Sequence, residues 1–309
     1  MKVWQGGIDE WGHTEPPGSA VSIGVFDGVH RGHQHVLHQL VELARRHGFV
    51  VAVLTFDIHP LDLVAPDRAP RLLTSLGQRL SVFEHLGVDL VGILRFAEVR
   101  QMTPDVFAKR VLGEHLLARL VAVGADFRYG MDRTGSVATL ARSGEVLGFE
   151  VAEVDLLTEH DGILSSTRVR RLVTAGEVEE AAAVLGRPFQ LVGTVVLGDG
   201  RGRTLGYPTA NLEVEARMVT PGHGVYAGWA EVGGGRWKAA VNVGVRPTFD
   251  GHDVTIEAHL LDFSEDLYGQ EMRLDFVARL RDEIRFPSVE KLVERIEQDV
   301  AETRKVLDG

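Results

Sequence analysis

The sequence contains no cysteine and no long hydrophobic run. Without cysteine there is no disulfide framework and no thiolate metal site. Without an apolar stretch of about 20 residues there is no expected membrane-spanning helix. Residues 1–11 carry one lysine and no apolar run, so we expect no secretory signal. These absences favour a cytoplasmic protein with no membrane partner.

Basic residues are also in the minority, with 33 Lys and Arg against 44 Asp and Glu and a net charge of −11. An acidic protein is poorly suited to bind a nucleic-acid backbone, so we expect no nucleic-acid partner. Nucleotides are not excluded, because a small anion needs only local N–H groups and a few basic side chains. The length of 309 residues and the 44% hydrophobic content predict two globular domains.

We expect the first domain at residues 1–186. Apolar runs alternate with stretches of helical spacing, which is typical of an α/β domain with a parallel sheet covered by helices on both faces. The predicted strands are 20–26, 49–56, 90–94, 120–124 and 149–156, and the predicted helical stretches are 34–47, 81–86, 104–117 and 177–185.

The pattern changes near residues 186–188, and we expect a second domain at residues 187–309. Glycine becomes frequent and short strand-like runs follow at close intervals, which indicates a mostly antiparallel sheet or β-barrel. The expected strands are 191–197, 225–232, 238–243, 254–261 and 272–276, and an amphipathic C-terminal helix is expected at about 288–306.

Residues 24–33 read GVFDGVHRGH and lie between a predicted strand and a predicted helix. Glycine in such a turn lets the backbone approach a ligand, and the helix start offers free N–H groups to phosphate. His30 and His33 bracket a glycine, so two imidazoles can donate hydrogen bonds to a polyphosphate as charge develops on it. A tight turn with two surface histidines is the alternative.

In the second half, residues 197–212 read LGDGRGRTLGYPTANL. The N–H groups of a glycine-rich loop can wrap phosphates, and Arg201 and Arg203 can attract them. Thr209 and Asn211 are oxygen donors two residues apart on an extended segment, so they point to the same side. Mg²⁺ favours such ligands, although a plain glycine-rich hairpin remains an alternative.

The first half resembles bacterial FAD synthetases, members of the HxGH nucleotidyltransferases, and the resemblance implies a Rossmann-like nucleotidyltransferase domain. Residues 24–33 match the family's first signature and residues 165–170, SSTRVR, its second. The resemblance implies ATP-binding residues for adenylyl transfer at Gly24, Phe26, Asp27, His30, His33, Ser165, Ser166, Thr167 and Arg170. It places Asp126 and Phe127 of residues 124–130 on the flavin side. It assigns the segment 55–60 to shaping the ATP site, and we give His59 no chemical step. Met131 and Ser136 depart from the family's pattern.

The second half resembles riboflavin kinases. Residues 202–212 match the family's long signature, and residues 224–228, 242–249, 266–269 and 280–286 match further segments. The resemblance implies Glu257 as general base for the riboflavin 5′-hydroxyl and Arg281 and Phe286 as flavin contacts, while a surface glutamate on an edge strand is the alternative for Glu257. Thr209 and Asn211 become the ligands of Mg²⁺. The implied ATP-binding residues of the kinase are Gly198, Gly200, Arg203, Gly206, Pro208, Thr209 and Asn211.

Together the two resemblances, which cover the chain from about residue 22 to 299, imply a bifunctional enzyme. Its kinase half converts riboflavin to FMN and its N-terminal half adenylylates FMN to FAD with release of pyrophosphate, each with ATP and Mg²⁺. We expect a monomer or a transient homo-oligomer. Three other hypotheses stay open: another HxGH adenylyltransferase, a kinase with a degenerate first domain, and a non-enzymatic flavin carrier.

Overall fold

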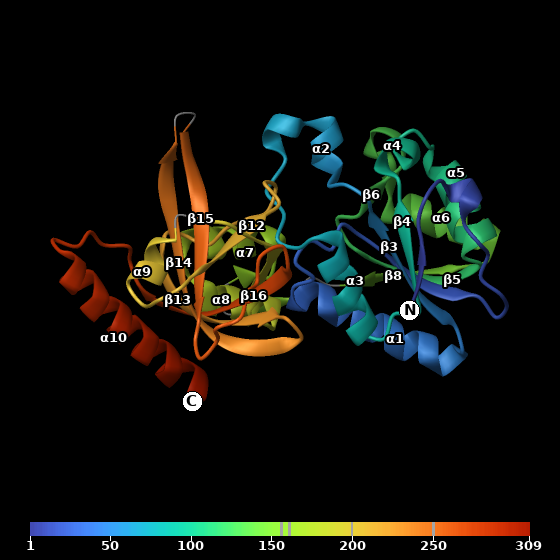
Figure 1. The fold of residues 1–309 in the computed structure, drawn as a ribbon. Helices are drawn as coiled ribbons and strands as arrows, with labels where there is room; N and C mark the ends of the chain where they lie inside the picture. Colours follow the sequence, from blue (N-terminus) through green and yellow to red (C-terminus); the bar gives the residue numbers. More distant parts are fainter. Residues whose placement is uncertain (155–156, 160–161, 199, 249–250) are drawn as a thin grey trace. The chain divides into compact units, whose positions relative to one another are not determined.

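The structure, a computed structural model, describes residues 1–154, 157–159, 162–198, 200–248 and 251–309. The chain forms two compact units, each with its own sheet (Figure 1). One unit comprises Met1–Pro70 and Ser75–Ser165, and the other comprises Arg71–Thr74 and Ser166–Gly309. No helix in the described ranges is both long enough and apolar enough to cross a membrane.

The first unit is built on a six-stranded sheet in the order β1-β4-β3-β2-β5-β8, in which every pair of neighbours is parallel. This confirms the predicted Rossmann-like domain. Because β2 has β3 on one side and β5 on the other, the chain leaves β2 where the strand order reverses, the usual ligand position in such sheets. The strands are β1 (Lys2–Trp4), β2 (Ser19–Ile23), β3 (Val50–Phe56), β4 (Leu90–Leu94), β5 (Ala118–Gly124) and β8 (Glu150–Val154).

Helices cover both faces of this sheet, and alternate residues of β3 show how. Val51 and Val53 pack in one apolar cluster with α1 and α3, whereas Ala52 and Leu54 pack in the other with α6 and the helical region before β5. The helices are α1 (Arg31–His47), α2 (Pro60–Val64), α3 (Leu76–His85), α4 (Phe96–Val99), α5 (Pro104–Phe107) and α6 (Val137–Leu147).

Some local features differ from the predictions. The stretch 104–117, expected as one helix, is α5 followed by a π-helical segment at Ala108–His115. The predicted strand 149–156 is β8, with residues 155 and 156 outside the described residues. The smaller elements are 3₁₀ turns at Ile8–Glu10, Pro66–Arg68 and Met131–Arg133 and the short strands β6 (Arg128–Tyr129), β7 (Gly135–Ser136), β9 (Thr158–Glu159) and β10 (Gly162–Ile163).

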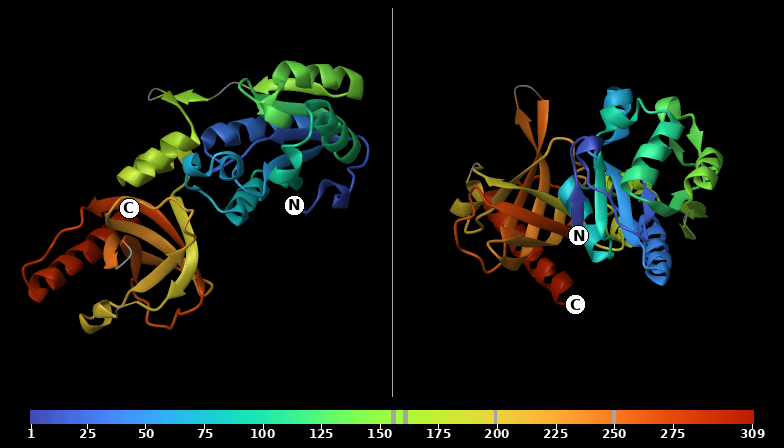
Figure 2. Two further views of the ribbon diagram at one scale, coloured as in Figure 1. Left: turned by 90° about the horizontal axis from the view of Figure 1, so that it is seen from above. Right: turned by 90° about the vertical axis from the view of Figure 1, so that its right-hand side faces the viewer.

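The second unit is a closed six-stranded barrel in the order β11-β12-β15-β14-β13-β16 with antiparallel neighbours. Figure 2 shows the strands of this unit curving around to close on themselves. The predicted barrel is thereby confirmed. Closure removes the exposed sheet edges that an open antiparallel sheet would leave. The strands are β11 (Phe189–Val196), β12 (Ala210–Val214), β13 (Gly224–Val232), β14 (Gly235–Thr248), β15 (Gly251–Leu260) and β16 (Glu271–Arg281).

Among the described residues of the barrel unit, the helices are α7 (Ser166–Ala175), α8 (Val178–Leu185), α9 (Arg201–Thr204) and α10 (Val289–Asp308). Helix α8 packs on β11 and β16 with its apolar side chains Val178, Val184 and Leu185 buried. The compact units therefore divide at Ser165, ahead of the boundary at 186/187 that composition suggests. Helix α10 lies along the outside of the barrel against β13, β14 and β16 (Figure 1).

A short strap from the first half of the sequence, Arg71–Thr74, also belongs to the barrel unit. The Leu72 N–H donates to the carbonyl of Arg217 at 2.7 Å, and the Leu72 carbonyl accepts from the Val219 N–H at 2.8 Å. Leu73 is fully buried. The strap is thus an extended segment paired with the chain that follows β12.

Candidate active sites

The turn from β2 into α1 holds an unusual backbone. Phe26 and Val29 adopt positive φ angles of 52° and 39°, and Gly28 lies between them at 80°. A β-branched residue such as Val29 rarely adopts this conformation, and each such non-glycine residue costs about 1–3 kcal/mol. Such conformations persist only where the surroundings enforce them, and they cluster at functional sites.

This turn brings His30 and His33 together, as the sequence predicts. Their rings stack with centroids 3.7 Å apart and an angle of 23° between planes. His30 is buried and forms the N-cap position of α1. Phe26 contacts the His33 ring edge-on, with centroids 5.2 Å apart. Burial first, and then the nearby His30, lower the pKa of His33 well below its ordinary value, so this imidazole is neutral at pH 7.

Two glycines of this region make close contacts with neighbouring rings. A Cβ on Gly24 would lie 3.1 Å from the Phe26 ring, and one on Gly32 would lie 3.1 Å from the His30 ring. The Gly32 position is also 3.6 Å from the carbonyl oxygen of Leu164. The chain just before Ser165 therefore lies at the start of α1, beside the histidine pair. Asp27, between the glycines, is buried as well.

The rest of the second signature lies in the other compact unit. Ser166 and Thr167 occupy the first turn of α7, and the Arg170 Nε donates to the carbonyl of Arg71 at 2.7 Å. A helix start with hydroxyl side chains and an arginine suits phosphate oxygens. Ser165, the first residue of this stretch, belongs to the same compact unit as the histidine pair.

The predicted flavin-side loop follows β5, the strand next to β2. Asp126 is exposed, and Phe127 stacks on Tyr129 with centroids 5.5 Å apart while packing on the apolar core. Phe127 therefore has a packing role in this structure. Of the two departures from the family pattern, Met131 is exposed, and Ser136 caps α6 by accepting a hydrogen bond from the Thr139 N–H at 3.3 Å.

In the segment 55–60, the first residue, Thr55, forms a hydrogen bond to the chain just before the β2–α1 turn. The buried Thr55 donates from Oγ1 to the carbonyl of Val25 at 3.1 Å, one residue before the strained turn. His59 accepts a hydrogen bond from the Leu61 N–H at 3.2 Å and caps α2.

In the barrel, the predicted base and one predicted metal ligand are cross-strand neighbours. Glu257 on β15 lies directly opposite Asn211 on β12 and, on its other side, opposite Asn242 on β14. Residues paired in this way point to the same face of a sheet, within reach of one another. Glu257 is half-buried. A carboxylate and two amides therefore form one polar row across three strands.

Two glycines of the neighbouring loop pack closely against residues of this row and the segment before it. A Cβ on Gly198 would overlap the side-chain amide of Asn211, and a Cβ on Gly202 would lie 3.4 Å from Thr209 Oγ1. Thr209 and Asn211 thus both face the glycine-rich loop. Pro208 directly precedes Thr209 in the sequence, and its carbonyl accepts a hydrogen bond from His259 Nδ1 at 2.8 Å. Residues 201–204 of the loop form the single turn α9, while residue 199 lies outside the described residues.

The remaining predicted ATP contacts of the kinase lie on the same loop. Gly200 and Gly206 have positive φ angles of 69° and 86°, and no protein atom within 4 Å would meet a Cβ at either position. The Arg203 side chain is exposed. The described part of the loop therefore presents open backbone at Gly200 and Gly206 and an accessible cation at Arg203.

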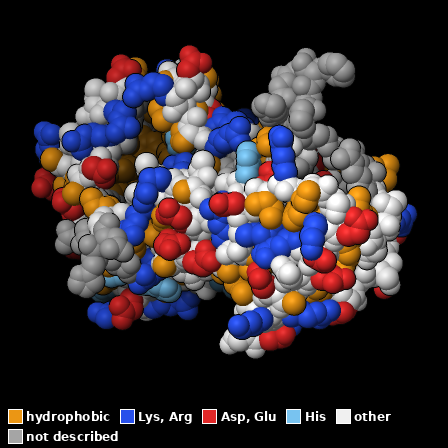
Figure 3. All heavy atoms as spheres, turned by 90° about the vertical axis from the view of Figure 1, so that its left-hand side faces the viewer, with side chains coloured by type: hydrophobic (Ala, Val, Ile, Leu, Met, Phe, Trp, Pro, Cys, Tyr) orange, Lys and Arg blue, Asp and Glu red, His pale blue; other side chains and the backbone are white. Residues whose placement is uncertain are grey.

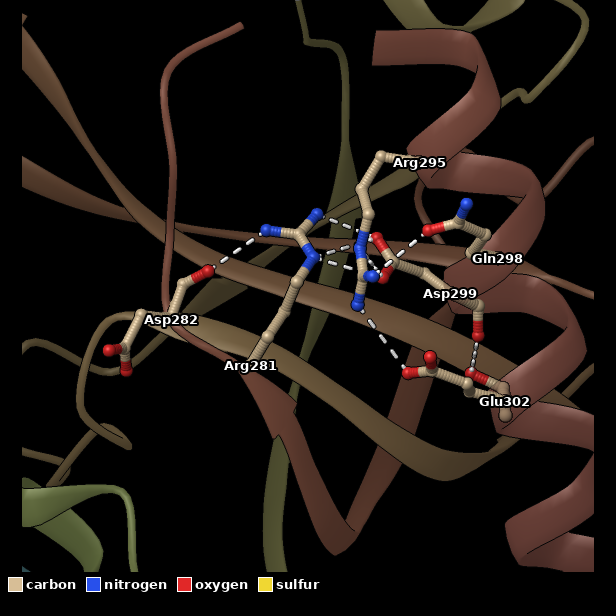
Figure 4. Close-up of polar contacts among 7 residues, drawn as sticks. Arg281, Asp282, Arg295, Gln298, Asp299 and Glu302 are labelled. Carbon is tan, nitrogen blue, oxygen red and sulfur yellow. Dashed lines mark hydrogen bonds and ion pairs between the residues drawn. The ribbon is translucent and has the colours of Figure 1, made fainter. Parts of the chain in front are cut away.

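Arg281, predicted to contact flavin, is engaged with α10 (Figure 4). Its Nε and one terminal nitrogen donate to the carboxylate of Asp299 at 2.9 and 2.6 Å, and Arg295 approaches the same carboxylate at 3.0 Å. The Asp299 side chain is only 5% exposed. Phe286 lies with its ring centre 5.8 Å from the Arg281 guanidinium carbon. In this structure Arg281 joins the barrel to its C-terminal helix.

Sequence reasoning missed three residues near these sites: Arg79, Asn242 and Asp299. Arg79 and Asp299 are charged residues on the inward faces of amphipathic helices, and an inward charge is the signal that was available. Asn242 belongs to a matched family segment, but only the strand register places it beside Glu257.

Comparison with known proteins agrees with this geometry. Residues 13–168 match the FAD synthetase family, and residues 185–307 match the riboflavin kinase family. The bifunctional riboflavin kinase/FMN adenylyltransferase of Escherichia coli K12 is 38% identical over 303 residues, covering 97% of this chain and 96% of the relative. The protein of the same name from Pseudomonas fluorescens is 39% identical over 293 residues, covering 94% and 93%.

Among solved structures, one titled as a macrolide-efflux protein from Streptococcus pneumoniae has a TM-score of 0.88 and 30% identity, covering 98% of this chain and 99% of that one. Its title describes that protein only. The full-length relatives and the two adjoining family matches lead to one conclusion: this chain belongs to the bifunctional riboflavin kinase/FMN adenylyltransferase family.

Proposed function

We propose that this chain makes FAD from riboflavin in two ATP-dependent steps, with the kinase step in the barrel and adenylyl transfer at the β2–α1 turn. The observation that carries the proposal is the presence of two separately built sites. One is the stacked His30 and His33 at a strained turn, and the other is the row that sets Glu257 opposite Asn211.

In the kinase step, the riboflavin 5′-hydroxyl oxygen attacks the γ-phosphorus of ATP and the bond to ADP breaks. Glu257 accepts a hydrogen bond from the hydroxyl, orients it and takes up its proton as the new bond forms. The open glycine loop at residues 198–206 offers backbone N–H groups to the phosphates.

We assign Mg²⁺ to Thr209 and Asn211. The fit rests on donor chemistry and placement, because both residues carry a neutral oxygen and both lie against the glycine-rich loop that we assign to phosphate binding. In the described ranges no group of three or more His, Cys, Asp or Glu side chains could hold a metal ion, so a site here depends on these neutral oxygens and on phosphate. Bound Mg²⁺ would neutralise phosphate charge.

In the adenylyl step, a phosphate oxygen of FMN attacks the α-phosphorus of ATP and pyrophosphate leaves. No proton has to be removed from the attacking phosphate. The role of His30 and His33 is therefore to donate hydrogen bonds to phosphate oxygens as charge builds there. The Ser165–Arg170 stretch supplies further donors, and Asp126 faces the flavin side.

The proposed location, partners and oligomeric state are those expected from the sequence. A cytoplasmic location suits two reactions that consume ATP. On the face drawn in Figure 3, basic and acidic side chains are interspersed, unlike the basic stripe of a nucleic-acid-binding surface. We propose a monomer or a transient homo-oligomer with small-molecule partners only.

The test is incubation with riboflavin, ATP and Mg²⁺, with the flavins resolved by chromatography over time. We expect FMN to appear first and FAD second, over many turnovers per chain. FMN without FAD would support the kinase with a degenerate first domain, and FAD formed only from supplied FMN would leave the kinase assignment wrong. A single bound flavin without turnover would support a carrier.

A further inference from the structure

We propose that Arg79 is a positioning residue for adenylyl transfer, holding the strained β2–α1 turn so that His30 and His33 are correctly placed. The inference rests on the proposed adenylyltransferase function of that turn. Arg79 lies on α3, and its side chain is almost fully buried, with 6% of the residue exposed.

The start of α3 is fixed by a reciprocal pair of hydrogen bonds. The Ser75 Oγ accepts from the Gln78 N–H at 3.2 Å, and the Gln78 side chain accepts from the Ser75 N–H at 2.9 Å. This arrangement is a capping box, and it fixes the residue at which the helix begins. It therefore also fixes the position of Arg79, which directly follows Gln78 in the helix. One turn later the buried Phe83 packs beneath the same strands.

The Arg79 guanidinium joins the ends of two adjacent strands. Its Nη1 donates to the Val25 carbonyl at 2.8 Å and to Thr55 Oγ1 at 2.9 Å, while Thr55 Oγ1 donates to the same Val25 carbonyl at 3.1 Å. These three groups form a closed triangle at the residue before the turn. A planar, permanently charged group suits this task, because it donates in fixed directions.

The turn that follows needs such an anchor. Phe26 and Val29 adopt φ angles that non-glycine residues avoid, and such strain persists only where neighbouring groups enforce it. Phe26 also contacts both His33, with ring centroids 5.2 Å apart, and Phe83, with centroids 5.5 Å apart. An unbroken path of contacts therefore runs from Arg79 through Val25 and Phe26 to the catalytic histidine pair.

Charge also favours a role beyond packing. Burial lowers the pKa of Arg79, and the buried carboxylate of Asp27 partly restores it. A buried ion pair is weak evidence for stability, because an apolar side chain in its place often stabilises a fold equally well. A cation at this position on α3 is therefore better explained by its effect on the turn that carries Asp27.

The experiment compares Arg79→Met and Arg79→Lys with the wild type, in the full-length chain. Two rates are measured in each variant: FAD formation from FMN and ATP, and FMN formation from riboflavin and ATP. Met keeps the length and apolar stem but removes all donors, while Lys keeps the charge and loses the two-directional geometry. Arg46→Met is the control, because Arg46 is an exposed arginine on α1 paired with Glu42.

We expect Arg79→Met to lower kcat for FAD formation about 10- to 100-fold, the size of effect produced by a small misplacement of catalytic groups. Arg79→Lys should show a smaller loss in the same direction. FMN formation should stay within twofold of wild type in both, since the barrel is a separate compact unit. Arg46→Met should change neither rate.

Thr55→Val tests the triangle itself. Its effect on kcat should not add to that of Arg79→Met, because both remove the same anchor from Val25. A folded Arg79→Met variant with kcat for FAD formation within twofold of wild type would overturn the proposal. If Arg79→Met does not fold, the Arg79→Lys variant is the test, and an unchanged kcat for FAD formation in that variant would overturn the proposal. A wild-type chain that makes no FAD refutes the proposed function instead, so the two failures are distinct.

Discussion

The carboxylate of Asp299 offers a quantitative test of how α10 is held on the barrel. It receives Arg281 through two nitrogens and Arg295 through a third, while only 5% of its side chain is exposed. Asp299→Asn keeps the shape but replaces an accepting oxygen with an NH₂ group that faces two cations. Removing one member of a buried ion pair costs about 3–5 kcal/mol.

The expected loss of free energy is smaller than this range, because the side chains of Arg281 and Arg295 are 15% and 25% exposed and can be solvated again by water. We therefore expect a loss of about 2–3 kcal/mol in the free energy of unfolding of the barrel unit. For a unit of about 150 residues this lowers its Tm by roughly 4–12 °C. Because Arg281 loses its anchor, the KM for riboflavin should also rise.

The assay is thermal unfolding with the two units followed separately, alongside both enzymatic rates. Asp262→Asn is the matched control, because Asp262 forms an equally close pair with Arg304 of the same helix but on the surface. Exposed pairs contribute little, so its Tm should barely move. If Asp299→Asn lowers Tm no more than Asp262→Asn does, the argument from burial is wrong.

Three further predictions concern the two sites and their boundary. Glu257→Gln should lower the kinase kcat about 10²- to 10⁴-fold, measured with saturating riboflavin, while FAD formation from FMN continues. Below pH 6.5 the unfolded chain binds a proton at His33 that the folded chain does not, because folding lowers the pKa of that imidazole. Stability should therefore fall as pH drops below about 6.5, by at most about 1.4 kcal/mol per pH unit for this group, and His33→Gln should remove that share of the decline in denaturant titrations at pH 7.5 and 5.5. The fragment 187–309 should make FMN but unfold at a lower temperature than the fragment 166–309, since it lacks the apolar face of α8 that packs on β11 and β16. Equal stability of the two fragments would show that α7 and α8 add nothing to the barrel.

The parts of the fold that sequence predicted are those with strong local patterns. The alternation of strands and helices gave the parallel sheet, and closely spaced short strands gave the barrel. Spacing of two residues predicted that Thr209 and Asn211 point to the same side. Asn211 lies in β12 and Thr209 just before it, and both lie beside glycines of the same loop. The HxGH pattern likewise predicted that His30 and His33 lie together.

The parts that sequence did not predict depend on pairings between distant residues. Strand register, which no local period reveals, sets Asn242 beside Glu257. Arg79 reaches Val25 across 54 positions, and Arg281 meets Asp299 through the return of α10 along the barrel. In each case the chemistry of a side chain was visible in the sequence, whereas its partner was determined only by the closed fold.

The division of the chain by packing differs from its division by family. The match to FAD synthetase ends at residue 168 and the match to riboflavin kinase begins at 185, yet the barrel unit already begins at Ser166. The second ATP signature, residues 165–170, thus starts in one compact unit and continues in the other. A cut at 165/166 keeps α7 and α8 with the barrel but removes most of that signature from the adenylyltransferase half. A cut at 186/187 keeps the signature but removes packing from the barrel, and both cuts leave the strap Arg71–Thr74 on the wrong fragment. No single cut can therefore leave both halves with everything that the full chain gives them.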